Sequence, residues 1–262
     1  MLGDDRMKKY FGVVVIILAY CMQMHRLIML YQRIDNVIFE THVGDYLLSF
    51  FYGTMPYTML GKGEPFNIPP YWSFYLLYVI FIFSVLYSSF SGKYEQQRMM
   101  RYKNRRRWWI AKNMMICREC ISCFLISGLT FLGFGICTGA QVTGLNIELL
   151  TTYFGIEVQN TDGKMFSAGL VFFLSLAAII YIQLVVTVYT NAIVGVLVSI
   201  AGLIASVYYM HPLLIGNFLM IIRLNMMEID GVSIGKDIVL CAIIVITMMF
   251  VGYNRVKKMD LF

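Results

Sequence analysis

Residues 165–210 form one apolar tract that contains no Lys, Arg, Asp or Glu. A helix needs about 20 apolar residues to cross the hydrocarbon core of a bilayer. The tract is too long for one crossing, and its length fits two helices that turn back near Tyr189, Thr190 and Asn191. The whole chain is 59% hydrophobic and 14% charged, whereas a soluble domain carries about 25% charged residues. The sequence therefore predicts a membrane protein.

Six apolar segments have the length of a crossing, at residues 10–31, 71–90, 113–139, 166–188, 191–210 and 237–253. We predict an all-α, polytopic protein whose residues 1–262 form a single transmembrane domain. Two other apolar stretches, 46–60 and 213–224, are too short to cross. We expect them to be re-entrant or interfacial helices on the outer side.

The distribution of positive charge supports six crossings. With the N-terminus inside, the inner segments hold 14 of the 21 Lys and Arg residues, and the outer segments hold five. This asymmetry matches the excess of Lys and Arg in cytoplasmic loops of membrane proteins. A seventh crossing at 46–60, which contains Gly53 and Pro56, would divide the basic segments between the two sides. Because the basic residues flank apolar runs, they indicate lipid headgroups and topology, and nucleic acid is not an expected partner.

Motifs for catalysis and cofactor binding are incomplete. Residues 231–237 read GVSIGKD, which is one residue short of a nucleotide-binding loop, and Asp237 replaces the Ser or Thr that would hold magnesium. His25, His42 and His211 are far apart and lack a metal-ligand spacing. We expect no catalytic residue and no cofactor site in this chain, which is not expected to be an enzyme.

Three cysteines at a spacing of three, Cys117, Cys120 and Cys123, also invite a metal interpretation. Soft-metal clusters usually need a fourth thiolate, and the other cysteines are scattered through predicted crossings. Buried cysteine otherwise behaves as a small hydrophobic residue. The sequence therefore predicts no metal site here.

Four polar residues fall inside predicted crossings: His25, Arg26, Arg118 and Glu119. A charge inside the membrane is a candidate for function. Arg26, however, lies near the outer end of its segment, where its long side chain can reach the interface. Arg118 and Glu119 lie near the inner end of theirs, as an ion pair or an interfacial anchor. We keep the four residues as candidates for intramembrane polar contacts and expect anchoring.

The loop at residues 91–112 is the most basic part of the chain, with seven Lys and Arg between residues 94 and 112. Charge of this kind sets topology and binds anionic lipid. The loop also contains Gln, Met and paired Trp residues, which a loop that acted only through its charge would not require. A mixed, amphipathic stretch of this kind could lie on the membrane and dock into a soluble partner.

The region around this loop resembles a known family. The residues that carry the resemblance are GKGEPF at 61–66, Ile68, Pro69 and Trp72, followed after the crossing by Tyr94, Gln96, Gln97, Arg101, Arg105, Arg106, Trp108, Trp109 and Lys112. The pattern is similar to membrane subunits of bacterial ABC-type exporters of the type-two permease class, in a Gram-positive subset. The resemblance covers about residues 60–115, the six-crossing layout and the tail at 257–260. It departs at Lys93, Glu95 and Asn104, where the family tends to have Gly, Gly and Ser.

The resemblance implies six helices with both termini on the cytoplasmic side of the bacterial cytoplasmic membrane. It also implies a short coupling helix in the loop at 91–112 that contacts a separate ATPase subunit, which binds ATP and magnesium. Two permease subunits, the second being the same or a different chain, would form the pathway for a peptide, a drug or a lipid-like substrate. The residues that would form or brace the coupling helix are Tyr94, Gln97, Arg101, Arg105, Trp108, Trp109 and Lys112.

Another class of function fits the same residues. The chain could be a non-transporting membrane scaffold or an immunity protein that binds a cytoplasmic partner through its basic loop. Such a protein would co-purify with its partner but would show no nucleotide-dependent change of shape. An intramembrane enzyme is disfavoured because no pair of inward-facing acids within one crossing is found.

Overall fold

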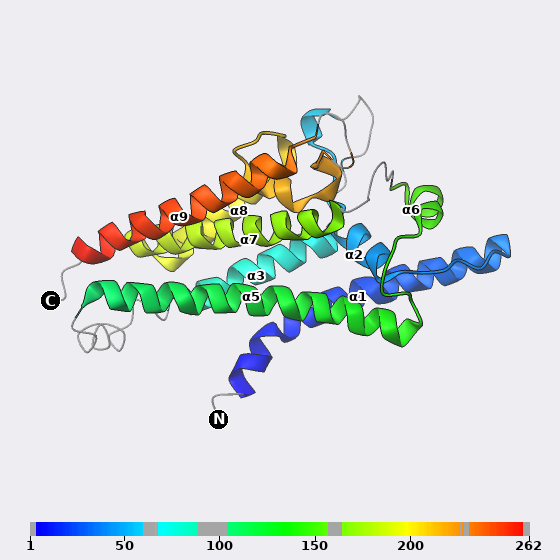
Figure 1. Cartoon of the computed structure of the whole chain (residues 1–262), viewed down its shortest axis with the longest axis horizontal. Helices are drawn as coiled ribbons and strands as arrows, with labels where there is room; N and C mark the ends of the chain where they lie inside the picture. The colour runs from blue at the N-terminus through cyan, green and yellow to red at the C-terminus, as the bar shows by residue number, and fades with distance from the viewer. Residues whose placement is uncertain are drawn as a thin grey trace.

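All regular secondary structure in the described part of the chain is helical, which confirms the predicted all-α class there. A computed structural model describes residues 4–59, 66, 68–88, 104–156, 164–225, 227 and 231–258, without the side chains of residues 4–8, 59, 88 and 164–166. Figure 1 shows the arrangement of the helices. In chain order they are α1 (Asp4–Asp35), α2 (Val43–Phe51), η1 (Tyr57–Met59), α3 (Pro70–Ser88), α5 (Arg105–Thr138), α6 (Ile147–Phe154), α7 (Lys164–Tyr189), α8 (Ala192–Tyr208), η3 (Ile215–Leu219), η4 (Ile221–Arg223) and α9 (Ile234–Lys258).

Five of the described helices are long and apolar enough to cross a membrane, and α8, at 17 residues, is shorter. The five long segments are Lys9–Asp35, Pro70–Tyr87, Arg105–Thr138, Ser167–Tyr189 and Ile234–Lys258. With α8 they occupy the six regions in which the sequence predicts crossings. The largest difference is at α5, which begins at Arg105 instead of near residue 113.

Capping by asparagine explains where α5 and α8 begin. The side-chain oxygen of Asn104 accepts a hydrogen bond from the N–H of Arg106 at 2.9 Å. Asn191 does the same for the N–H of Val194, also at 2.9 Å. Asn is as good an N-cap as Ser, because both satisfy an N–H that has no partner within the helix. Asn104, where the sequence departs from the family resemblance, therefore still provides a helix start.

Helix α7 lies at the centre of the bundle. It packs against α8 and α9, and α1 packs against α3 and α5. Most of the apolar stretch of α7 is buried, whereas little of that of α9 is fully buried. Figure 1 shows α5, α7 and α9 running along the long axis, while the N-terminal part of α1 turns away from the other helices.

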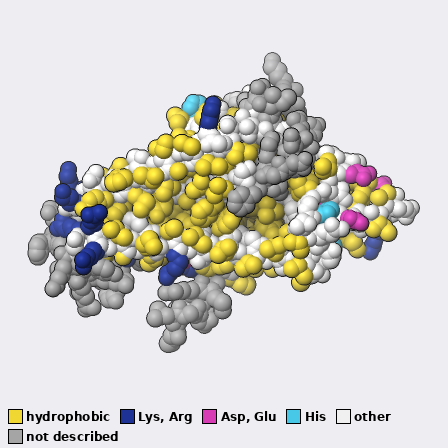
Figure 2. All heavy atoms as spheres, in the orientation of Figure 1, with side chains coloured by type: hydrophobic (Ala, Val, Ile, Leu, Met, Phe, Trp, Pro, Cys, Tyr) yellow, Lys and Arg dark blue, Asp and Glu magenta, His cyan; other side chains and the backbone are white. Residues whose placement is uncertain are grey.

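Charged side chains collect at the two ends of the bundle. Figure 2 shows Lys and Arg at the end where α5 begins and α9 stops, and Asp and Glu at the opposite end, with hydrophobic side chains between them. We call the first the basic end, formed by residues 104–107 and 255–258, and the other the far end, where α1 stops and α2 and α6 lie. A broad apolar band between two polar ends is the surface expected of a protein in a bilayer.

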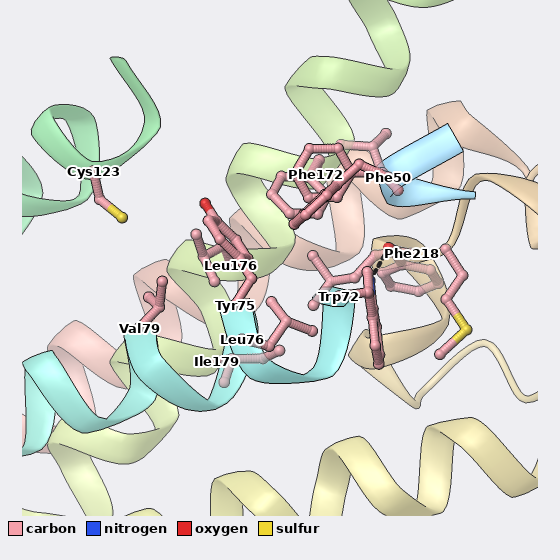
Figure 3. Close-up of a cluster of buried hydrophobic side chains, with 14 of the residues drawn as sticks. Phe50, Trp72, Tyr75, Leu76, Val79, Cys123, Phe172, Leu176, Ile179 and Phe218 are labelled. Atoms are coloured by element: carbon pink, nitrogen blue, oxygen red, sulfur yellow. Dashed lines mark hydrogen bonds between the residues drawn. The ribbon is translucent and has the colours of Figure 1, made fainter. Parts of the chain in front are cut away.

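Aromatic side chains form much of the core between α2, α3 and α7, as Figure 3 shows. The ring centroids of Phe50 and Tyr75 are 5.7 Å apart in an edge-to-face arrangement, a favourable geometry for aromatic rings. Trp72 donates a hydrogen bond from its indole N–H to the carbonyl of Leu219 at 2.8 Å. Because lipid tails are as apolar as the core, such packing and hydrogen bonds hold the helices together, and burial alone contributes little.

Short elements at the far end are tied together by polar contacts. Helix α2 has nine residues, about 14 Å, which is too short to cross a bilayer. At its start the buried carboxylate of Asp45 accepts hydrogen bonds from the N–H groups of His42 and Asn146, both at 2.8 Å. Burial raises the pKa of Asp45, while these two donors favour its charged form and oppose the shift. Asp45 thus joins the start of α2 to the start of α6.

The apolar stretch at 213–224, expected to be one short helix, forms two 3₁₀ helices, η3 and η4, separated by Met220. Close packing against α8 accounts for part of this difference. Gly216 lies so near α8 that a Cβ atom added there would lie 2.5 Å from the hydroxyl oxygen of Ser206. The side chain of Asn217 is also held, since it donates to the carbonyl of His211 at 3.0 Å.

Arg223 is the largest fully buried side chain in the described part of the chain, and it organises the far end. Its guanidinium group donates to the carbonyls of Thr54 at 2.8 Å and Val207 at 3.0 Å. It also donates to the carbonyl of Ser206 and the side-chain oxygen of Asn217. The carbonyls at the end of α8 have no partners within the helix, and a positive charge there is favourable.

Burial lowers the pKa of Arg223 to about 10, so the side chain stays charged at neutral pH. No carboxylate accompanies it among the partners named above, and its charge is instead balanced by backbone and amide oxygens. Arg223 thereby connects the C-terminus of α8, the chain after α2, and η3.

We predict that Arg223→Ala lowers the free energy of unfolding by about 3 kcal/mol, because it leaves several buried oxygens without donors. Thermal unfolding of the detergent-solubilised protein measures this as a clear drop in Tm. Arg33→Ala removes an exposed arginine from the same end and should leave the Tm nearly unchanged. Equal Tm values for the two variants would show that the buried network contributes little.

Candidate functional site

The start of α5 holds four of the seven predicted coupling residues: Arg105, Trp108, Trp109 and Lys112. The other three, Tyr94, Gln97 and Arg101, lie outside the described residues, as do Lys93 and Glu95. The assignment of all seven to a coupling helix stays a prediction. What the structure adds is the environment of the four residues on α5.

Trp109 fastens the start of α5 to the end of α9. Its side chain is buried, and its indole N–H donates to the carbonyl of Met249 at 3.0 Å. The ring occupies a notch at Gly252, where an added Cβ atom would lie 2.5 Å from the ring carbon Cζ2. One turn nearer the basic end, Arg105 donates to the carbonyl of Lys257 at 2.5 Å. These contacts clamp the first turns of α5 onto the last turns of α9.

Trp108 and Lys112 are buried as well. The ammonium nitrogen of Lys112 lies 5.6 Å from the centroid of the Trp108 ring, within the range of a cation–π contact. Next to Lys112, the side-chain nitrogen of Asn113 donates a hydrogen bond to the carbonyl of Trp109 at 2.7 Å. The paired Trp and the Lys therefore face the interior of this chain and do not project from its basic end.

The exposed positive charges of the basic end form what we call the basic surface. It consists of Arg106 and Arg107 on α5 and Arg255, Lys257 and Lys258 on α9. The guanidinium carbon of Arg255 also lies 5.4 Å from the centroid of the Tyr189 ring, at the end of α7. Sequence reasoning singled out Arg105, but its exposed neighbours Arg106 and Arg107 are better placed to contact a lipid headgroup or a protein partner.

A second polar group, which we call the polar cluster, joins α1 to α5. Its members are Lys9, Tyr10, Arg118 and Glu119, and the carboxylate of Glu119 lies at its centre. One carboxylate oxygen of Glu119 accepts from the Lys9 ammonium and from the Tyr10 hydroxyl, the latter at 2.5 Å. The other oxygen accepts from Arg118 at 3.0 Å. The ion pair expected between Arg118 and Glu119 is present, and Lys9 and Tyr10 extend it across two helices.

The polar cluster lies at the start of the apolar stretch of α1 and part-way along that of α5. The apolar stretch of α1 starts at Lys9. On α5, Glu119 lies about 21 Å from the start of the helix at Arg105 and about 29 Å from its end at Thr138. The cluster therefore lies at the start of the apolar stretch of α1 and inside that of α5.

Two cavities flank the polar cluster. One, of about 480 Å³, lies between α1 and α5 and is lined by all four residues of the cluster together with Phe11, Val14, Ser122 and Ile126. The other, of about 370 Å³, lies against α3 and shares Lys9 and Glu119 with the first. Apart from these charged groups, the walls are largely aliphatic and aromatic. The contact between Lys9 and Glu119 therefore divides two apolar hollows on the flank of the bundle.

The other two predicted intramembrane polar residues are separate from the polar cluster. His25 is half-buried, and its ring nitrogen Nδ1 lies 3.0 Å from the hydroxyl of Tyr46 on α2. The ring of His25 also meets that of Phe134 edge to face, at 6.1 Å between centroids. Its neighbour Arg26 is exposed. His25 thus links α1 to α2 and α5, while Arg26 points to the surroundings of the bundle.

Sequence reasoning missed the roles of Lys9, Arg223 and Asp237. In the sequence, Lys9 counts only among the inner basic residues, Arg223 lies at the end of an outer apolar stretch, and Asp237 begins the last predicted crossing. Asp237 is buried, and one of its carboxylate oxygens has no hydrogen-bond partner among the described residues. No sequence signal distinguishes these residues from exposed charges, because Lys9 and Arg223 bond to the distant residues Glu119 and Thr54 and no local pattern marks the burial of Asp237. No group of three or more His, Cys, Asp and Glu side chains in the described ranges is arranged to hold a metal ion.

Comparison of the chain with protein-family models, with curated proteins and with solved structures found no match in any of the three.

The Trp109 notch gives a direct test of the clamp between α5 and α9. We predict that Gly252→Ala lowers the free energy of unfolding by about 1–3 kcal/mol, because the new methyl group displaces the Trp109 ring. Gly133→Ala is the matched control, since a Cβ atom there has no neighbour within 4 Å and alanine favours the helix. Thermal unfolding and hydrogen exchange of residues 105–112 measure the effect. Identical behaviour of the two variants would contradict the clamp.

Proposed function

We propose that this chain is the transmembrane permease subunit of an ATP-driven ABC exporter in a bacterial cytoplasmic membrane. ATP hydrolysis would take place on a separate ATPase subunit that binds ATP and magnesium. A second permease subunit, identical or different, would complete the pathway for a peptide, a drug or a lipid-like substrate. The proposal starts from the resemblance of residues 60–115, and the contacts between α5 and α9 at the basic end support it.

The observation that carries the proposal is the clamp between α5 and α9 at the basic end. Closure of an ATPase pair must push on a rigid element if it is to move helices. Residues 105–112, the last part of the segment 91–112, are the first turns of α5, and these turns are fixed to α9 through Trp109, Arg105 and their carbonyl partners. A push on this loop would therefore move two long helices as one unit.

The same end has the charge expected of the cytoplasmic side. The basic surface gathers five exposed Lys and Arg residues from α5 and α9. Under the positive-inside rule this end would face the cytoplasm, and it would present the chain to a soluble ATPase. Contacts with anionic lipid would use the same residues.

Six crossings require α8 to cross the membrane. Its 17 residues span about 26 Å, a few Å less than a typical hydrocarbon core. A bilayer accommodates such a mismatch by local thinning or by snorkelling of flanking residues. With α8 as a crossing, both termini and the loop at 91–112 lie on one side, as the charge distribution requires.

Purification in mild detergent tests the proposal through the partner that remains bound. We expect a soluble ATPase in stoichiometric amount, identified by mass spectrometry. The double substitution Arg106→Glu with Arg107→Glu should reduce the retained ATPase by about tenfold or more, since each reversed charge at an interface costs roughly 1 kcal/mol. Arg33→Glu makes the same kind of change at the far end and should leave retention unchanged.

Two other outcomes would contradict the permease assignment. If the intact chain purifies without an ATPase, the partner that the permease assignment requires is missing. A different protein bound through the basic surface, with no change in cross-linking when MgATP is added, would favour the scaffold or immunity protein instead. The structure is compatible with that alternative because the basic surface would attract any acidic partner.

A further inference from the structure

We propose that the cavity between α1 and α5 binds an anionic phospholipid, with its phosphate against Lys9 and Arg118 and an acyl chain along the apolar walls. This inference does not depend on transport, and it requires only that the helices lie in a bilayer. It rests on the charge of the polar cluster, on the shape of the cavity and on its level in the membrane.

The polar cluster has a net charge of about +1 at neutral pH. Lys9 and Arg118 share the single carboxylate of Glu119, and Tyr10 is neutral. All the described charged side chains that line the cavity belong to this cluster. A net positive charge beside hydrocarbon is unfavourable, so a bound anion would stabilise it.

Both basic side chains remain accessible to such an anion. The side chain of Arg118 is 55% exposed and that of Lys9 is 27% exposed, whereas that of Glu119 is 7% exposed. Arg118 uses its Nη2 atom for Glu119, and a guanidinium group has five N–H donors in a geometry that suits phosphate. The carboxylate is thus enclosed while the two cations face the cavity.

The remaining wall suits an acyl chain. Phe11 and Val14 on α1 and Ile126 on α5 line the same cavity. Val14 and Ile126 both lie further along their helices than the charged residues, in the direction of the far end. A lipid whose phosphate contacts Lys9 and Arg118 would therefore direct its chain towards the middle of the bilayer.

The position of the cavity in the bundle favours a lipid over a water-soluble anion. The N-terminal part of α1 turns away from α5 in Figure 1, and the cavity lies in this region. The apolar stretch of α1 starts at Lys9, so on this helix the cluster lies at the level at which lipid phosphates would be expected.

Native mass spectrometry of the detergent-solubilised full chain tests the inference. The protein is incubated with equal amounts of phosphatidylglycerol and phosphatidylcholine of the same chain length, and the lipid that stays bound is counted. We expect phosphatidylglycerol to be retained preferentially. Arg118→Gln brings the cluster to zero net charge and should reduce this retention by about tenfold or more, the loss expected for a charged hydrogen bond.

Two variants control for charge and for space. Arg26→Gln removes the same charge from an exposed position on the far-end half of α1 and should leave retention unchanged. Ile126→Trp fills the cavity while keeping every charge and should also reduce retention. Size-exclusion chromatography checks that each variant is folded.

Three results would overturn the inference. They are equal retention of the two lipids, no effect of Arg118→Gln, and an equal effect of Arg26→Gln. A further arm uses inorganic phosphate as the competitor. Displacement of the lipid by millimolar phosphate would assign the cluster to a free anion and would exclude the lipid site, whereas resistance to phosphate supports it.

Discussion

Hydrocarbon offers no hydrogen bonds, and most of this structure follows from that constraint. A backbone N–H or C=O group left unpaired in a bilayer costs several kcal/mol, so a crossing segment must satisfy its own backbone. The regular elements of the described chain are accordingly all helical. Three buried serines follow the same rule, because Ser127, Ser175 and Ser199 each donate to the carbonyl four residues earlier in their own helix. Polar residues can therefore lie within the apolar helices without an uncompensated donor.

Contacts between helices use the same chemistry. The indole N–H of Trp109 and the hydroxyl of Tyr87 each donate to a carbonyl on a neighbouring helix. The amide of Gln183 does so as well, since it donates from α7 to the carbonyl of Ile80 on α3 at 3.0 Å. In a bilayer, burial of apolar surface does not favour one helix face over another. These hydrogen bonds, together with the close packing at Gly252, therefore determine which faces of the helices pack together. The clamp between α5 and α9 is one product of this rule.

Much of the fold could be predicted from the sequence, because apolar length and charge asymmetry are local properties. The tract at 165–210 indicated two helices, and the structure has α7 and α8 there, with Asn191 capping the second. The start of α5 was harder to place. Asn104 is a good cap, but basic residues and Trp follow it, and they were interpreted as a surface loop.

The candidate site was less predictable, because its contacts join residues that are distant in the chain. Lys9 and Glu119 are separated by 110 positions, and no local pattern marks them as partners. Arg223 follows an apolar stretch and resembles a snorkelling anchor, yet it is fully buried. The indole N–H of Trp109 donates to the carbonyl of Met249 and its ring lies against Gly252, and no local pattern in the sequence indicates that the paired Trp residues face the bundle. Such pairings depend on the three-dimensional arrangement of the helices.

The central claim is that six helices cross the membrane with the basic end in the cytoplasm. The claim depends on whether α8, the shortest of the six, crosses. Single cysteines at Thr190 and His211, the exposed positions next to its two ends, can be introduced after replacing the six native cysteines. A membrane-impermeant maleimide is then applied to intact and to permeabilised cells. Six crossings predict that the cysteine at position 211 reacts in intact cells and the one at 190 only after permeabilisation. Labelling of both positions from the same side would show that α8 does not cross and would contradict the topology.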